Sequence, residues 1–132
     1  MKSRYLHPWL VPQLMICLCL ALGCTRSSDA YRVDSNTARK TLDQVLASWQ
    51  AGDRPEDWQS QTPQVVVQDM DWKSGAKLLD YQILDDGEAL DANLHCQVKI
   101  KLEAPGKSAT ERTVTYLVST NPVLTVFRAL GP

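Results

Sequence analysis

Between residues 38 and 49, apolar side chains recur every three or four positions, which is the spacing of one face of an α-helix. The stripe consists of Ala38, Leu42, Val45, Leu46 and Trp49. Three residues before it can cap the first free amides, namely Asp34, Ser35 and Asn36. Gly52 can adopt the left-handed conformation that ends a helix. The pattern predicts one amphipathic helix of about four turns.

A second, short helix is predicted directly after it. Asp53 at the N-cap and Glu56 three residues later resemble a capping box, and Pro55 suits the first turn. We expect this helix to run through Trp58 and to end before the Thr62-Pro63 pair, because the residue before a proline disfavours helix.

The rest of the chain is typical of β-strands. Over residues 92–103, apolar and polar side chains alternate without a break, so this strand has one buried and one wet face. Shorter strands are predicted over Val65–Gln68, Leu79–Ile83, Arg112–Thr120 and Val123–Leu130. Residues 69–77 are predicted to form a turn or brief helix around Gly75.

Short connections join the last four strands, whereas a parallel return takes about a dozen residues or more. These strands should therefore form an antiparallel meander. The sequence predicts an α+β fold, in which the N-terminal amphipathic helix packs on a curved antiparallel sheet of four to five strands.

The first 23 residues have a different character. Lys2 and Arg4 precede an apolar run over Leu14–Leu22, which is the layout of a secretory signal. Nine residues span only about 14 Å of helix, roughly half of a bilayer core. We therefore interpret residues 1–23 as a signal peptide and not as a membrane-spanning helix.

The sequence Ala-Leu-Gly-Cys at 21–24 resembles the lipobox of bacterial lipoproteins, although Ala21 stands where leucine is commoner. The resemblance implies cleavage before Cys24 and acylation of its sulfur. Thr25 follows in place of the aspartate associated with inner-membrane retention, which favours the outer membrane of a two-membrane bacterium. The alternative is a secreted protein with an unmodified Cys24.

Residues 24–34 form a polar tether in this interpretation, and residues 35–132 form a single α+β domain. The chain is 44% hydrophobic and 22% charged, which is an ordinary globular balance. Two of the 14 basic residues and none of the 15 acidic ones precede Cys24, so the remainder is mildly acidic. Nucleic-acid binding is disfavoured, because such binding needs concentrated positive charge.

The order of one helix followed by strands resembles the nuclear transport factor 2-like cone folds, also called cystatin-like, over residues 35–130. Several local phrases are similar to those of short bacterial lipoproteins without assigned chemistry. They are Asp71-Trp72 with Gly75, Leu78-Leu79-Asp80-Tyr81, residues 113–118, and Pro122 leading to Leu124-Thr125-Val126 with Arg128. Cone-fold enzymes work from a pocket between helix and sheet with an Asp or His base.

His95 and Cys96 lie outside the leader and are the first candidates for such chemistry. The alternation in their strand places them on opposite faces, so His95 should point away from the core and Cys96 into it. An outward His lacks reach to a pocket, and a buried thiol lacks the exposure and nearby cation that favour thiolate. A catalytic role is disfavoured for both.

Metal and cofactor sites are not expected. Residues 69–80 place aspartates at positions one, three and twelve of a calcium loop. However, Lys73 stands where an oxygen ligand is needed, and Ser74 replaces the sharp-turn glycine. Zinc, triad and phosphate-loop motifs do not occur in the sequence.

Two binding surfaces follow from the predicted strands. A candidate ligand pocket is lined by Trp58, Trp72, Tyr81 and Tyr116, with core packing as the alternative role of these rings. A candidate partner face carries His95, Lys99, Thr113 and Thr115.

The leading hypothesis is a lipid-anchored, non-catalytic interaction or accessory module that presents this face to an envelope protein. A small-ligand-binding cone domain is the alternative, and an enzyme ranks last.

Overall fold

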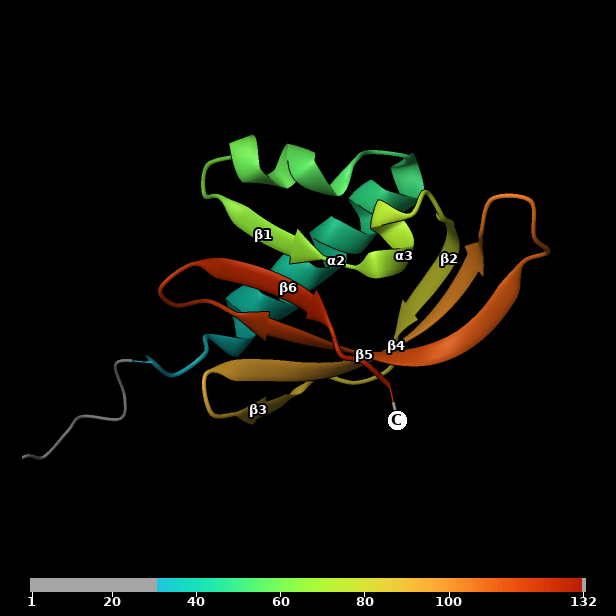
Figure 1. Cartoon of the computed structure of the whole chain (residues 1–132). Coiled ribbons are helices and arrows are strands. Elements are labelled where there is room, and N and C mark those ends of the chain that lie inside the picture. The colour runs from blue at the N-terminus through green and yellow to red at the C-terminus, as the bar shows by residue number, and fades with distance from the viewer. Residues whose placement is uncertain (1–30, 132) are drawn as a thin grey trace, which may run out of the picture.

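A computed structural model describes residues 31–131 of the chain. One long helix, α2 (Ser35–Ala51), lies against a strongly curled sheet (Figure 1). Two short helical elements follow, the 3-10 helix η2 (Pro55–Ser60) and α3 (Met70–Lys73). The strands are β1 (Val65–Gln68), β2 (Lys77–Ile83), β3 (Glu88–Leu90), β4 (Asn93–Glu103), β5 (Thr110–Ser119) and β6 (Leu124–Arg128). The expected α+β fold with an N-terminal helix on a curved sheet is confirmed. The predicted signal peptide (residues 1–23), Cys24 and residues 25–30 of the predicted tether lie outside the described residues.

Helix α2 begins and ends where the sequence indicates. The carboxylate of Asp34 accepts a hydrogen bond from the Thr37 amide at 3.1 Å, so Asp34 is the N-cap. Gly52 has a φ of 94° and donates its N–H to the last turn, the conformation that glycine adopts without a steric penalty. The apolar stripe from Ala38 to Trp49 is buried, and it packs against strands β2, β4, β5 and β6.

The cap of the second helix differs from the predicted one. Arg54 is the N-cap of η2, and the Asp57 side chain accepts from its amide. Asp53 instead accepts a hydrogen bond from the Ser48 hydroxyl at 2.7 Å. The prediction was shifted by one residue because Asp53 is held by the end of α2, which leaves Asp57 to fill the N3 position.

The sheet is mixed, which corrects the prediction of a wholly antiparallel one. Its strand order is β1-β6-β5-β4-β2, and the short β3 also pairs with β4. The predicted meander of β2, β4, β5 and β6 is present, but β1 pairs parallel to β6. A parallel pair needs a long connection, and here the whole of β2 to β5 supplies it. The length of a connection constrains only strands that are consecutive in the chain, so it gives no information on the pairing of β1 with β6.

A β-bulge in β2 changes the face on which its leucines lie. The register shifts between Leu78 and Asp80. As a result, Leu78 is buried, whereas Leu79 is exposed. The predicted alternation therefore holds for Tyr81 and Ile83, which pack against the core, but not for Leu79, because a bulge inserts an extra residue and resets the period of two.

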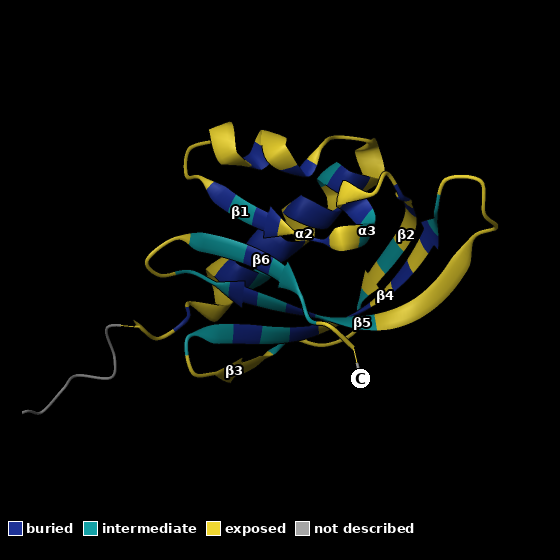
Figure 2. Ribbon diagram, viewed as in Figure 1, coloured by how far each residue is buried: buried dark blue, intermediate teal, exposed yellow. Residues whose placement is uncertain are grey.

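The core fills the space between α2 and the inner face of the sheet (Figure 2). Strand β4 contributes every second side chain, namely Leu94, Cys96, Val98, Ile100 and Leu102, and all are buried. In contrast, residues 110–113 at the start of β5 are exposed (Figure 2). The curled sheet therefore opens at the end where β5 begins, and the candidate site described below lies at this open end.

Gly87 sits where any side chain would strike the core. A Cβ there would lie 2.7 Å from Leu94 Cγ and 2.8 Å from Cys96 Sγ, and φ is 88°. Gly106 has a φ of 71° with open space around it. We expect Gly87→Ala to lower the free energy of unfolding by about 1–3 kcal/mol more than Gly106→Ala, because it adds overpacking to the same backbone strain. Chemical denaturation of the two variants measures the difference, and equal losses would contradict it.

Candidate functional site

A buried carboxylate lies at the junction of β1 and α3. Asp69 directly follows β1 and is only 2% exposed. Its Oδ1 accepts from the amides of Asp71 at 2.9 Å and Trp72 at 3.2 Å, so it is the N-cap of α3. Its Oδ2 accepts from the Tyr116 hydroxyl at 2.7 Å. A buried charge is stable only when it is paired and hydrogen-bonded, and Asp69 meets both conditions because a cation is also present.

That cation is Arg128 at the end of β6. Its Nη1 lies 3.3 Å from Asp69 Oδ1, and its Nη2 donates to Asp71. Arg128 is paired with Tyr116 across the β5–β6 ladder, so both side chains project from the same face of the sheet toward Asp69. The two strands therefore deliver a guanidinium and a phenol to one carboxylate.

The pKa values in this group follow from burial and the carboxylates. Burial, followed by the charge of Asp69, raises the pKa of Tyr116 well above its usual value. Burial alone would lower the pKa of Arg128, but the carboxylates of Asp69 and Asp71 outweigh it and raise the pKa. Tyr116 is therefore a neutral donor and Arg128 a permanent cation at physiological pH.

Asp71 connects this pair to a second arginine. Its carboxylate accepts from both Arg112 and Arg128. Arg112 lies opposite Ile100 in the β4–β5 ladder, and the Arg112 side chain is 49% exposed. A guanidinium has five N–H donors, and Arg112 directs one nitrogen to Asp71, so donors remain for a further partner. We call these residues the Asp–Arg cluster: Asp69, Asp71, Arg112, Tyr116 and Arg128.

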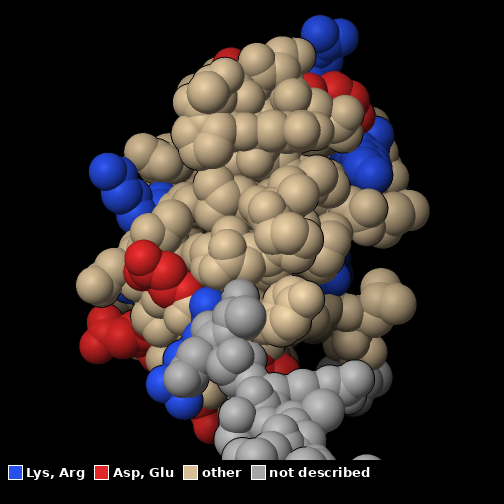
Figure 3. Space-filling view, turned by 90° about the vertical axis from the view of Figure 1, so that its left-hand side faces the viewer, with Lys and Arg blue, Asp and Glu red and all other residues tan. Residues whose placement is uncertain are grey.

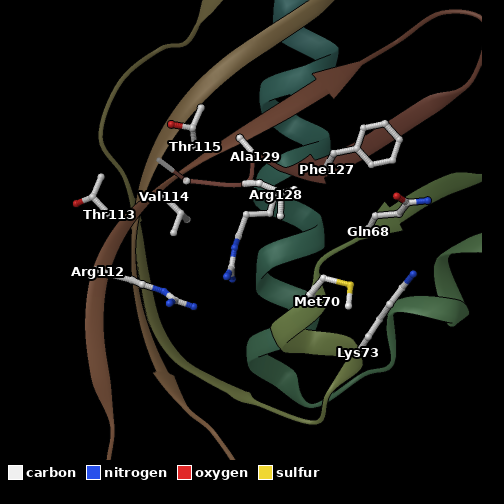
Figure 4. A pocket seen from close by; sticks show the side chains of 12 residues that line it. Gln68, Met70, Lys73, Arg112, Thr113, Val114, Thr115, Phe127, Arg128 and Ala129 are labelled. Atoms are coloured by element: carbon white, nitrogen blue, oxygen red, sulfur yellow. The ribbon is translucent and has the colours of Figure 1, made fainter.

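The two arginines of the cluster line an open groove of about 780 Å³ between α3 and β5 (Figure 4). Its three charged lining residues are all basic, namely Lys73, Arg112 and Arg128. Its apolar side chains include Met70, Val114, Phe127 and Leu130. Figure 4 shows the Lys73 and Met70 side chains rising from α3 on one wall, with residues of β5 on the other. We call this feature the basic groove.

The charge of the groove suits an anionic partner. Two carboxylates of the cluster neutralise Arg112 and Arg128, while Lys73 forms no ion pair within residues 31–131. A surplus cation therefore remains on the α3 wall of the groove, across from an arginine with spare donors on β5 (Figure 4). By contrast, the end of the molecule where β5 turns into β6 shows uncharged surface at its centre and charges at its margin (Figure 3). A carboxylate or phosphate group would be attracted to the groove.

His95 and Cys96 lie on opposite faces of β4. His95 is partly buried between Glu88 of β3 and Leu117 of β5 on the outer face. Cys96 is fully buried in the core, and burial raises the pKa of its thiol. A nucleophile and its base must lie within hydrogen-bond reach, and these two side chains point in opposite directions. Within residues 31–131, no group of His, Cys, Asp and Glu could hold a metal ion.

The four aromatic residues of the candidate ligand pocket do not come together around one pocket. Trp72 Nε1 donates to Asp53 O at 2.9 Å, and Trp58 Nε1 donates to Ser48 Oγ at 3.1 Å. Tyr116 points to the Asp–Arg cluster and is part of the core.

Tyr81 bonds to Asp43 on α2 at 2.9 Å. Burial, and then that hydrogen bond, raise the pKa of Tyr81 to about 12. The structure thus brings two of the four rings, Trp58 and Trp72, to the end of α2, and it places the other two elsewhere.

Trp72 has a partner that the sequence did not indicate. Its ring stacks on Trp49 with centroids 5.1 Å apart and an interplanar angle of 8°. Trp49 Nε1 donates to Ala76 O at 2.9 Å. Both indoles border a second open groove of about 530 Å³, but both are nearly buried. This stack anchors α3 to α2 and thereby positions Asp69 and Asp71.

The candidate partner face divides into two parts. Lys99 lies opposite Thr113, and Thr115 lies opposite Gln97, on the same outer face as His95. Thr113 and Thr115 line the basic groove. Lys99 instead pairs with Glu111 at 3.0 Å. The groove therefore meets the outer face along β5.

Sequence reasoning missed the Asp–Arg cluster, although a signal was present. Arg128 follows Val126 with a spacing of two, so it occupies an inward position of β6, and Arg112 precedes Val114 and Tyr116 in the same way. A charged residue at an inward strand position needs a buried partner of opposite charge. This signal indicates buried acidic partners, but it does not identify Asp69 and Asp71, whose nearness depends on the pairing of β1 with β6.

No helix among residues 31–131 is long and apolar enough to cross a membrane. Comparison of the chain with protein-family models, with curated proteins and with solved structures found no match.

Proposed function

We propose that this chain is a lipid-anchored, non-catalytic accessory module of the cell envelope that binds a partner in the basic groove. The observation that carries the proposal is the groove itself, about 780 Å³ in volume, with three cations and no acidic side chain in its lining. The Asp–Arg cluster holds this surface rigid, because two arginines are fixed by hydrogen-bonded carboxylates. Rigid, preorganised donors lose less entropy on binding than mobile ones.

The packing of the interior supports an external binding surface. The space between α2 and the sheet is occupied by core side chains, including Leu42, Leu46 and Ile100, each at most 1% exposed. The two grooves described above are both open at the surface. A small anionic molecule is the second candidate ligand, since the groove volume lies within the range of roughly 300–1,000 Å³ that such sites occupy.

The arrangement of reactive groups supports a non-catalytic role. His95 and Cys96 face away from each other across β4, and neither lines the basic groove. The carboxylates of Asp69 and Asp71 are held by arginines. Neither carboxylate is among the residues that line the groove, and a general base must lie within hydrogen-bond reach of its substrate. The groups around the groove are therefore suited to binding.

Membrane attachment rests on the lipobox-like residues 21–24, which lie outside the described residues. Acylation of Cys24 would hold the domain at a membrane surface, since two or more acyl chains give stable anchoring. The resemblance to the nuclear transport factor 2-like cone folds likewise stays a prediction.

The test is photocrosslinking in intact cell envelopes, with a photoreactive amino acid in place of Met70 of the full chain. Met70 lines the groove and is 68% exposed. The control is Gln44, which is exposed on α2. We expect a discrete product at Met70, its loss with Lys73→Glu, and no product at Gln44. We also expect Cys24→Ser to move the chain into the soluble fraction. Equal products at both positions, or none, would contradict groove binding.

A further inference from the structure

Strand β5 has a free edge beside the basic groove. Strand β6 pairs with β5 only over residues 116–119. The last bond between them runs from the Ala129 amide to Thr115 O at 2.8 Å. Over residues 110–114, β5 pairs with β4 on one side and with no strand on the other within the part of the chain that is described.

The backbone groups of this edge point toward the groove. Successive residues of a strand direct their N–H and C=O groups to alternate sides. Thr115 directs its carbonyl to the β6 side, so Thr113 and Glu111 direct theirs the same way. Thr113 is exposed and lines the groove. Its amide and carbonyl are therefore available to a further strand.

The charge beside this edge selects one kind of strand. Arg112 projects from β5 into the groove, and Lys73 lies across the groove on α3 (Figure 4). Like charges directly opposite each other destabilise a strand pair, and opposite charges stabilise it. A second copy of this chain paired edge to edge would bring its own Arg112 against the first, which is unfavourable. An acidic strand would meet cations instead.

We propose that an extended, acidic peptide segment of a partner protein adds to the edge of β5 at residues 111–113, in line with β6. Its backbone bonds to Thr113 and Glu111. The side chains on its inner face are carboxylates that meet Lys73 and Arg112, and the side chains between them lie on the outer face beside Thr113. This inference rests on the proposed function and names the partner class of the same groove. Strand addition draws affinity from main-chain bonds and specificity from side chains.

Three synthetic hexapeptides test the proposal against the full chain by fluorescence anisotropy. The first alternates glutamate and valine, the second alternates lysine and valine, and the third is the first peptide N-methylated on alternate amides. We expect the acidic peptide to bind at least about tenfold more tightly than the basic one, because opposite charges attract in the groove. We expect N-methylation to weaken binding by a similar factor, because it removes the ladder donors while keeping the charge.

Two variants of one residue separate backbone pairing from side-chain contact. Thr113→Pro removes the amide that faces the free edge and leaves the β4 ladder intact, since proline is tolerated where the N–H faces solvent. Thr113→Val keeps that amide. We expect the proline variant to bind the acidic peptide about tenfold more weakly than the valine variant does. Lys73→Glu serves as an independent variant, with Lys40→Glu on the exposed face of α2 as its control.

The outcomes distinguish strand addition to β5 from binding of an anion in the groove. Equal binding of the methylated and unmethylated acidic peptides, with loss in Lys73→Glu, would overturn strand addition and keep the groove as an anion-binding site. Failure of the acidic peptide to bind would overturn strand addition, and the Met70 crosslink would then decide the proposed function by itself. A concentration-dependent dimer lost in Thr113→Pro would show that a second copy occupies the edge and would also overturn the proposal.

Discussion

Asp69→Ala is expected to lower the free energy of unfolding by about 3–5 kcal/mol, the cost of breaking a buried ion pair from one side. The substitution removes the N-cap of α3 and leaves the Tyr116 hydroxyl without its acceptor. It also leaves Arg128, whose side chain is 16% exposed, with only Asp71 as a counterion. A loss of this size lowers Tm by more than about 12 °C in a domain of about 100 residues.

The matched control is an exposed ion pair on the same sheet. Glu111 pairs with Lys99 at 3.0 Å, and both side chains are about half exposed. Glu111→Ala should change stability by less than about 1 kcal/mol, because solvent screens such pairs. Thermal unfolding of both variants gives the comparison. Similar Tm values for Asp69→Ala and Glu111→Ala would show that the Asp–Arg cluster does not hold the open end of the sheet together.

Val98→Asp is expected to abolish folding. Val98 is fully buried in β4, between Ile83 of β2 and Val114 of β5. An aspartate there is a buried charge without a counterion, and the cost of several kcal/mol is comparable to the whole stability of a small domain. We expect the far-ultraviolet circular dichroism of the native sheet to disappear.

His95→Ala, three residues away on the outer face of the same strand, is the control for this change. His95 is only partly buried, so its truncation should cost less than about 1 kcal/mol, far below the loss expected for Val98→Asp. If the chain tolerated both substitutions equally, the assignment of inner and outer faces to β4 would be wrong.

The elements predicted best from the sequence are those set by local periodicity. Helix α2 has both a continuous apolar stripe and end signals at Asp34 and Gly52, so its existence and its limits were predictable. Strand β4 alternates over its whole length, which fixes the burial of Cys96 and the outward position of His95. In each case the residues of the element itself determine its type and its buried face.

Features that depend on distant partners were not predictable in this way. The parallel pairing of β1 with β6 joins residues 65–68 to 124–127 and has no local signature. The bulge at Leu79 breaks the period of two by one residue. The Asp–Arg cluster draws on β1, α3, β5 and β6. The only local signal for the cluster is that Arg112 and Arg128 occupy inward positions of their strands. This signal can be recognised only after β5 and β6 have been assigned.

The most direct test of the central claim is a nuclear magnetic resonance titration of the isotope-labelled full chain with the acidic hexapeptide. Amide shifts should concentrate at residues 111–115 of β5 and at Lys73, and the Thr113 amide should become protected from hydrogen exchange. Amides of the β5–β6 turn, none of whose residues lines the groove, should stay unchanged. Shifts spread evenly over the surface, or a Thr113 amide that exchanges as fast with the peptide as without it, would contradict the claim that a partner strand occupies the groove.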